Sequence, residues 1–312
     1  MIWRAYEPNS FVHFMPGKCR TVLVLGAGAS SHLGFPLGPE LCAKIISNTG
    51  NRESEAFKSL LDMRFDAEAI VSFHHCLKNF LPRTIDQFLA ERPEFRSVGK
   101  AAIAQVIIAQ EDENKLLRPD ANWYFLLADR IRSAIDRNVF PPFIVTFNYD
   151  LSLDKCLYGF LKITKRHQNI KTLNEAISVL HVHGSLGQID DEKGPWFRSY
   201  GKNLSPEEIM EASQGIRVPD ELDNDYGRVM VGAQRAIEEA ERVIFLGFGY
   251  DEMNLNRLAI TNWKPSKFHG TAFNFDRQAR QQLLARTSKT LSLGVSKFAI
   301  YEYLQRTNCW NY

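Results

Sequence analysis

The chain has 312 residues, of which 45% are hydrophobic and 24% are charged, and its formal net charge is +2. This composition is typical of an ordinary globular protein, and the nearly balanced charge gives no global electrostatic case for direct binding to nucleic acid or to a membrane surface. The length fits one large α/β domain with an insertion, or two modest domains that share a cleft.

Residues 1–18 carry Arg4, Glu7 and His13 among their apolar residues, so we expect no signal peptide. No stretch reaches the roughly 18 uninterrupted apolar residues of a membrane-spanning helix. An odd number of cysteines without a close pair argues against a disulfide framework and against a structural zinc site. The five are Cys19, Cys42, Cys76, Cys156 and Cys309. We therefore expect a cytoplasmic protein with reduced thiols and no metal site.

The first predicted element is a buried parallel strand at Thr21–Leu25, which ends in a glycine cluster. Pro39 fits the first turn of a helix that continues over Glu40–Ser47. Residues from about 50 to 140 contain no convincing strand, and prolines divide them into helices. The clearest of these helices are Ala67–Phe80, Ser97–Gln110 and Ala121–Arg137. We therefore predict a helical insertion at about 50–140.

Strand character returns at Phe143–Phe147, Ala176–Val182 and Val243–Leu246, with a further candidate at Thr271–Phe275. Strands that alternate with helices predict an α/β fold with a Rossmann-like, doubly wound, mainly parallel sheet. We expect a single domain over residues 1–312, with the helical insertion and no separate sensor domain.

Two helices precede the strand at Val243–Leu246. One starts at Ser205, where Ser-Pro-Glu-Glu forms a capping box. The other lies near Tyr226–Glu241 and has an apolar stripe at helical spacing, which predicts core packing. Thr84 is predicted to cap a further helix in the insertion, which explains the stretch Thr84–Leu89 without a function.

Ligands of doubly wound sheets bind at the carboxyl ends of the strands. After the first strand comes Gly26-Ala27-Gly28-Ala29-Ser30, where a glycine turn lets backbone N–H groups approach a pyrophosphate and Ser30 adds a hydroxyl donor. The spacing departs from G-x-G-x-x-G, and no acidic residue stands about 20 positions later to hold a ribose. A tight turn without a ligand is the alternative.

Asn148 and Asp150 follow the second strand, where they either cap the next helix or hold a ribose, a water or a carboxamide. The third strand ends in His181 and His183, which strand alternation places on one face. A histidine near its ordinary pKa of about 6.5 suits a general base. We favour His183 as the base, because Gly184 leaves open space beside it, and we favour a structural role for His181.

A second glycine turn, Gly247-Phe248-Gly249, follows the strand at Val243–Leu246 and suits a nucleotide ribose or phosphate. Asp251 or Asn254 then caps the next helix. The order of these motifs resembles the sirtuin (silent information regulator two) family, whose members read Gly-Ala-Gly-x-Ser, Thr-Gln-Asn-x-Asp, His-Gly and a late glycine turn. Ile-Asp-x-Phe-Leu at 85–89 and Asn122-Trp123-Tyr124 look like the bacterial anti-phage branch of that family.

The resemblance implies that NAD is the ligand. Its implied pyrophosphate site is Gly26, Ala27, Gly28 and Ser30. Asn148 would contact the nicotinamide ribose and place a water, Asp150 would lie near the carboxamide, and His183 would be the catalytic base. Gly247 and Gly249 would border the adenosine half.

Two departures separate the chain from the deacylase sirtuins. Gly34-Phe35-Pro36 runs into Leu-Gly-Pro rather than Asp-Phe-Arg, and the two C-x-x-C pairs of the zinc ribbon are missing. This pattern resembles the defence-associated NADases, which cleave NAD to nicotinamide and ADP-ribose during phage infection. By the same analogy we expect a homo-oligomer or a partner subunit, such as a helicase-like ATPase or an Argonaute-type protein. The alternatives are a sirtuin-type deacylase or ADP-ribosyltransferase, and a non-catalytic sensor of NAD or ADP-ribose.

Overall fold

A computed structural model describes residues 21–307, except positions 81, 83, 119, 121, 164–168, 190–196, 202, 220–224, 261–262 and 265. The expectation for residues 1–18 therefore falls outside the described residues, as do Cys19 and Cys309. Within them, six parallel strands form one sheet in the order β3-β2-β1-β4-β5-β6. The strands are β1 (Thr21–Leu25), β2 (Phe143–Thr146), β3 (Val179–His181), β4 (Arg242–Leu246), β5 (Phe268–Gly270) and β6 (Ser292–Leu293).

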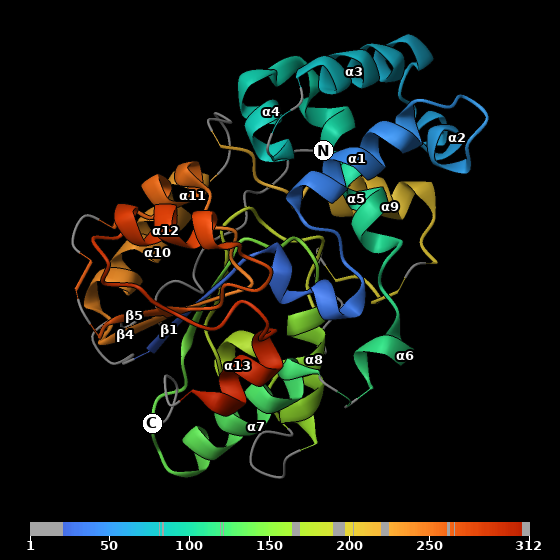
Figure 1. Cartoon of the computed structure of the whole chain (residues 1–312). Coiled ribbons are helices and arrows are strands. Elements are labelled where there is room, and N and C mark those ends of the chain that lie inside the picture. Colours follow the sequence, from blue (N-terminus) through green and yellow to red (C-terminus); the bar gives the residue numbers. More distant parts are fainter. Residues whose placement is uncertain are drawn as a thin grey trace.

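The α-helices of the described residues cover both sides of this sheet (Figure 1). They are α1 (Gly38–Thr49), α2 (Glu55–Asp62), α3 (Ala67–Phe80), α4 (Ile85–Glu91), α5 (Arg96–Ile108), α6 (Glu113–Leu116), α7 (Trp123–Asp136), α8 (Ser152–Lys162), α9 (Pro206–Ser213), α10 (Tyr226–Glu239), α11 (Glu252–Arg257), α12 (Arg277–Arg286) and α13 (Ile300–Arg306). None of the described helices is both long and apolar enough to cross a bilayer.

The strands bury alternate side chains in two separate cores. In β1, Leu23 and Leu25 pack into a core with helices α7, α8 and α13, whereas Val22 and Val24 pack into a second core with α10 and α12. All four side chains are at most 1% exposed. A strand with helices against both faces has to be apolar throughout, which is why TVLVL shows no polar alternation. The predicted α/β, Rossmann-like, doubly wound fold is confirmed, and the sheet is entirely parallel.

The predicted helical insertion is also confirmed, because the described residues between β1 and β2 contain helices and no strand. Helices α1–α5, together with α9, form a helical lobe beside the sheet (Figure 1). Helix α3 has the predicted bounds, and α5 begins one residue early and ends two residues early. Helix α7 begins at Trp123 because Asn122 is its N-cap. Helix α9 arises much later in the chain and packs against α5.

The predicted helix caps are confirmed as well. Ser205 Oγ accepts a hydrogen bond from the N–H of Glu208 at 3.2 Å, and the Glu208 carboxylate accepts one from the N–H of Ser205 at 2.8 Å. Thr84 Oγ1 accepts a bond from the N–H of Gln87 at 3.3 Å. The apolar stripe of α10 is buried, as expected for core packing.

The strand predicted at Thr271–Phe275 is wrong. The strand at this place is β5 (Phe268–Gly270), and after Thr271 the chain turns, with Asn274 at a φ of +60°. Strand β3 is shorter than the predicted Ala176–Val182, because a 3-10 turn at Leu173–Glu175 precedes it and a tight turn follows His181. The two-residue strand β6 was not predicted, since two residues carry no periodicity.

A buried ion pair holds the two ends of the loop that follows β3. Glu111, after α5, is fully buried, and Arg198 donates to both of its carboxylate oxygens. The same carboxylate accepts a hydrogen bond from the N–H of Gly201 at 2.9 Å. Arg198 also donates to the carbonyl of Leu186, so this one pair ties both ends of the loop to the helical lobe.

This arrangement predicts a large cost for Glu111→Gln, because the variant leaves the Arg198 guanidinium buried without a counter-charge. We expect the free energy of unfolding, measured by urea denaturation, to fall by about 3–5 kcal/mol. The matched control is Glu68→Gln, which breaks an exposed pair with Arg52 at 2.7 Å and should cost less than about 1 kcal/mol. Equal effects of the two variants would contradict the structural role of the buried pair.

Candidate functional site

The two glycine turns pack directly against each other at the carboxyl edge of the sheet. The N–H of Gly28 donates to the carbonyl of Gly247 at 2.9 Å, and the N–H of Gly26 donates to that of Leu246 at 3.2 Å. A Cβ atom on Gly26 or on Gly28 would lie 2.8 Å from the Gly247 carbonyl oxygen. Gly247 itself has a φ of +58°, in the left-handed region that favours glycine. Contact between the turns therefore accounts for these three glycines.

Several N–H groups of the first turn are used within the chain. Besides Gly28, the N–H of Ala29 donates to Gly26 at 2.8 Å and that of Ser30 donates to Ala27 at 3.3 Å. The turn continues into two short 3-10 segments, η3 (Ala27–Ala29) and η4 (Ser31–Leu33), and α1 begins only at Gly38. The pyrophosphate role of this turn stays a prediction, and in this geometry its amide donors are largely satisfied.

The helical insertion holds the first turn through three consecutive residues at the start of α7. Asn122 Oδ1 lies 3.0 Å from His32 Nε2, and Trp123 Nε1 donates to the carbonyl of Ala29 at 2.8 Å. Tyr124, the third, lies with its hydroxyl 2.9 Å from Ser30 Oγ. Each of the three is at most 2% exposed. The Asn-Trp-Tyr stretch is therefore buried and holds the glycine turn in place.

Ser30, Asn148 and Asp150 meet in one hydrogen-bonded cluster. Ser30 Oγ donates to Asp150 Oδ2 at 2.8 Å and accepts a bond from Asn148 Nδ2 at 3.0 Å. A serine hydroxyl has one proton, so Tyr124 has to be the donor in its contact with Ser30. Asp150 Oδ1 accepts from the N–H of Ser152 in α8 at 3.0 Å, as the capping alternative expects. The Ser30 hydroxyl is 1% exposed and fully engaged within the chain.

Asn148 retains one unused acceptor. Its Oδ1 is buried and has no hydrogen-bond partner among the described residues. Its backbone carbonyl lies 3.2 Å from His181 Nδ1, and His181 Nε2 lies 3.2 Å from both oxygens of Asp154. Burial lowers the pKa of His181, but the charge and the hydrogen bond of Asp154 raise it, and the net shift is upward. These contacts favour the structural role expected for His181.

His183 lies apart from this cluster. Strand β3 ends at His181, so alternation does not extend to His183, whose ring packs 5.4 Å from that of Phe147 and 5.8 Å from that of Tyr226. Gly184 does not leave the open space we expected, because it has a φ of +72° and a Cβ there would collide with the Gly215 carbonyl. The imidazole is therefore enclosed, with 3% of the side chain exposed.

Asp86 is a polar neighbour of His183 that the sequence interpretation did not assign. Its Oδ1 lies 3.6 Å from His183 Nδ1 and accepts a hydrogen bond from the hydroxyl of Tyr149. His183 Nδ1 is buried and has no hydrogen-bond partner among the described residues. Burial lowers the pKa of His183; Asp86 opposes this and Arg257 adds to it. The lowered pKa favours the neutral imidazole, which is the form that a general base needs.

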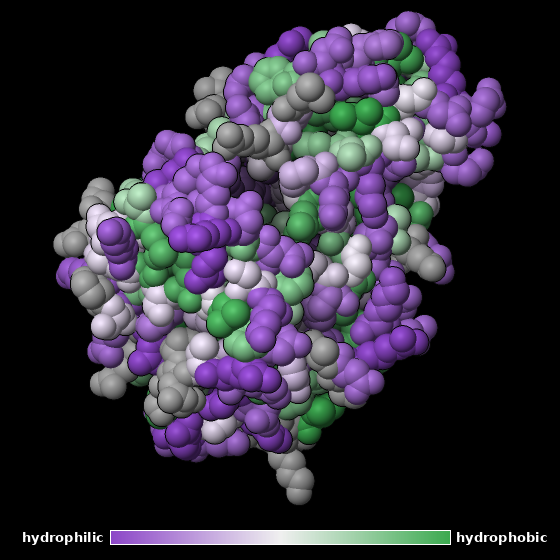
Figure 2. All heavy atoms as spheres, viewed as in Figure 1, coloured by the Kyte–Doolittle hydropathy of each residue, from purple (hydrophilic) through white to green (hydrophobic). Residues whose placement is uncertain are grey.

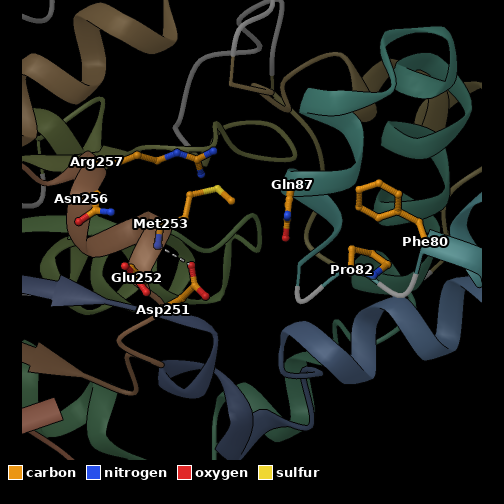
Figure 3. A pocket seen from close by; sticks show the side chains of 8 residues that line it. All are labelled: Phe80, Pro82, Gln87, Asp251, Glu252, Met253, Asn256 and Arg257. Carbon is orange, nitrogen blue, oxygen red and sulfur yellow. Dashed lines mark hydrogen bonds between the residues drawn. The ribbon is translucent and has the colours of Figure 1, made fainter. Parts of the chain in front are cut away.

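A cleft of about 930 Å³ lies between the helical lobe and α11, and none of the residues predicted for the site is among the described residues that line it. Figure 2 shows this face hollowed between the lobe and the α11–α12 side, and Figure 3 shows the opposing side chains. Gln87, the residue after Asp86, lines one wall, and Arg257 lines the other. The Arg257 guanidinium lies 5.9 Å from the centre of the Tyr226 ring, which packs on His183. The volume suits a ligand of nucleotide or dinucleotide size.

The structure thus groups the predicted residues into a buried cluster and a separate histidine. Ser30, Asn148 and Asp150 are in direct contact, whereas His183 contacts Asp86 and three aromatic rings instead. Gly249 is exposed, and a Cβ there would meet nothing within 4 Å, so packing does not require this glycine. Tyr124 and Asp86 stand in the two stretches that mark the resemblance, although no role was assigned to them.

Comparison with protein-family models and with curated proteins finds no match for the chain. In the part of the chain that the structure describes, no group of three or more histidine, cysteine or acidic side chains is placed to hold a metal ion. The site is therefore interpreted from its own geometry.

The contact between the glycine turns predicts different effects at two neighbouring positions. Gly247→Ala should lower the free energy of unfolding by about 2 kcal/mol or more, because of its positive φ and its contact with residues 28–29. Gly249→Ala is the control and should change it by less than about 0.5 kcal/mol. Chemical denaturation of both variants measures this, and a Gly247→Ala protein as stable as the wild type would refute the packing.

The environment of His183 predicts a measurable titration. By NMR, its imidazole should titrate below 6.5, and Asp86→Asn should lower that pKa further, because the variant removes the carboxylate that favours the charged form. His181 serves as the internal control, since its pKa depends on Asp154 and should not move. An unchanged or raised pKa of His183 in Asp86→Asn would show that the two groups do not interact.

Proposed function

We propose that the protein is an NAD glycohydrolase of sirtuin-like type, which cleaves NAD to nicotinamide and ADP-ribose. The observation that carries the proposal concerns the two residues that the sequence singled out for catalysis. Both Asn148 Oδ1 and His183 Nδ1 are buried polar atoms without a hydrogen-bond partner among the described residues. Native proteins provide hydrogen-bond partners for nearly all buried polar atoms. A buried polar atom without a partner therefore indicates a ligand, a water or a catalytic role.

The chemistry of NAD cleavage makes modest demands on the protein. Nicotinamide leaves the ribose as a neutral molecule, so no general acid is required, and the transition state has oxocarbenium character at the ribose. The protein has to position the ribose, exclude bulk water and accept one proton from the attacking water. In this proposal Asn148 Oδ1 accepts a hydrogen bond from that water or from a ribose hydroxyl, and His183 takes the proton.

Asp86 would act on His183 as a positioning residue. At 3.6 Å, the Asp86 oxygen is too far from Nδ1 for a hydrogen bond, but catalytic hydrogen bonds commonly shorten when substrate binds. A shift of a few tenths of an ångström would let Nδ1–H donate to Asp86 and leave Nε2 as the basic nitrogen. Because only 3% of the His183 side chain is exposed, the ribose reaches it only when the neighbouring side chains move aside.

An enzyme that consumes NAD has to be held inactive until it is needed. We therefore include in the proposal a role in anti-phage defence by NAD depletion, with control by oligomerisation or by a partner subunit in the cytoplasm. The enclosure of His183 is the observation that favours the second candidate, a sensor that binds NAD or ADP-ribose without turnover.

Nicotinamide release from NAD tests the proposal. The wild type should release nicotinamide, and His183→Ala should be slower by about 10²-fold or more, as should Asn148→Ala. His75→Ala, on the exposed side of α3, is the matched control and should retain wild-type activity. Near-wild-type turnover by His183→Ala or Asn148→Ala would contradict the assignment, whereas tight NAD binding without turnover at any protein concentration would favour the sensor.

The downward shift of the His183 pKa predicts how that activity depends on pH. A base has to be unprotonated, and its pKa is below the ordinary 6.5. Turnover should therefore be more than half-maximal at pH 6.5 and should fall as the pH drops through the lowered pKa. An acidic limb centred above pH 6.5 in the rate profile would be inconsistent with His183 as the base.

A further inference from the structure

The two acidic residues that line the cleft make contacts with groups other than Arg257. Asp251 caps α11 by accepting a hydrogen bond from the N–H of Met253 at 3.0 Å, as Figure 3 shows. Glu252 lies 3.5 Å from Arg286 of α12. Asp251 and Glu252 are the only carboxylates among the described residues that line the cleft. Neither of them forms an ion pair with Arg257 within the part of the chain that the structure describes.

Arg257 is the only basic residue among the described residues that line the cleft. Its guanidinium lies 3.4 Å from Asn254 Oδ1 and 5.9 Å from the centre of the Tyr226 ring, and it forms no ion pair with a carboxylate of the described residues. In Figure 3 it extends from α11 toward the opposite wall. A partly buried guanidinium that no described carboxylate pairs with, in a cleft of nucleotide size, is suited to an anionic ligand.

The first glycine turn is poorly placed to bind that anion alone. The N–H groups of Gly28, Ala29 and Ser30 donate to carbonyls of the chain, and the Ser30 hydroxyl donates to Asp150. A phosphate would have to displace these bonds, whereas the Arg257 guanidinium faces the cleft already. We therefore expect an anion to bind at the wall of the cleft that α11 forms.

We propose that Arg257 binds the diphosphate of a dinucleotide or of ADP-ribose through charge-assisted hydrogen bonds. The inference rests on the proposed function for the identity of the ligand and adds the residue that recognises its charge. The Tyr226 ring lies 5.9 Å from the Arg257 guanidinium and 5.8 Å from the His183 ring, so a diphosphate on Arg257 would bring the attached ribose toward the residues that enclose His183. Arg257 is thus a binding and positioning residue.

Calorimetric binding of ADP-ribose tests this inference without requiring turnover. Arg257→Met should weaken ADP-ribose binding about 10- to 100-fold, as expected for the loss of charge-assisted hydrogen bonds. Arg257→Lys should restore part of the affinity, since lysine keeps the charge but loses the bidentate geometry. Binding of uncharged adenosine should change less than twofold between the wild type and Arg257→Met. Arg235→Met, at an exposed site on α10, is the control of equal charge change.

The outcomes separate this inference from the proposed function. ADP-ribose binding that is absent from the wild type, or that is within twofold of wild type in Arg257→Met, overturns the role of Arg257. If NAD is cleaved while Arg257→Met keeps the wild-type KM, the glycohydrolase stands and the inference fails. If ADP-ribose binding depends on Arg257 but NAD is not cleaved, the inference stands and the proposed hydrolysis fails.

Discussion

A single oxygen atom, Ser30 Oγ, joins three segments that are distant in the sequence. It accepts hydrogen bonds from Tyr124 of α7 and from Asn148 after β2, and it donates its one proton to Asp150. Because all of its bonding capacity is used at 1% exposure, the glycine turn, the helical insertion and the second strand end are fixed relative to one another. The orientation that leaves Asn148 Oδ1 unpaired follows from this cluster, since Asn148 Nδ2 is committed to Ser30.

The cleft differs from this rigid cluster in its electrostatics. Arg257 forms no ion pair with the acidic residues that the structure describes, and its charge lowers the pKa of His183. The same charge that attracts an anion therefore helps to keep the base neutral. A bound diphosphate would offset that charge, so ligand binding and the basicity of His183 are coupled through Arg257.

The sequence predicted those features that local pattern determines. Continuous apolar runs and helix caps located β1, β2, β4 and α9, and strand alternation with helices predicted the parallel sheet. The site was predicted less completely, because its key contacts join distant residues: nothing near Asp86 indicates that it meets His183, and Gly184 was misread because Gly215 approaches it from another segment. Likewise, the glycines at 26, 28 and 247 resemble a ligand signature, while contact between two turns already requires them.

The most direct test of the account is a crystal structure of the protein with ADP-ribose. The account predicts density in the cleft between the helical lobe and α11, with the diphosphate on Arg257 and a ribose hydroxyl at His183 or at Asn148 Oδ1. ADP-ribose bound elsewhere on the molecule, or an empty cleft at a saturating concentration, would contradict it.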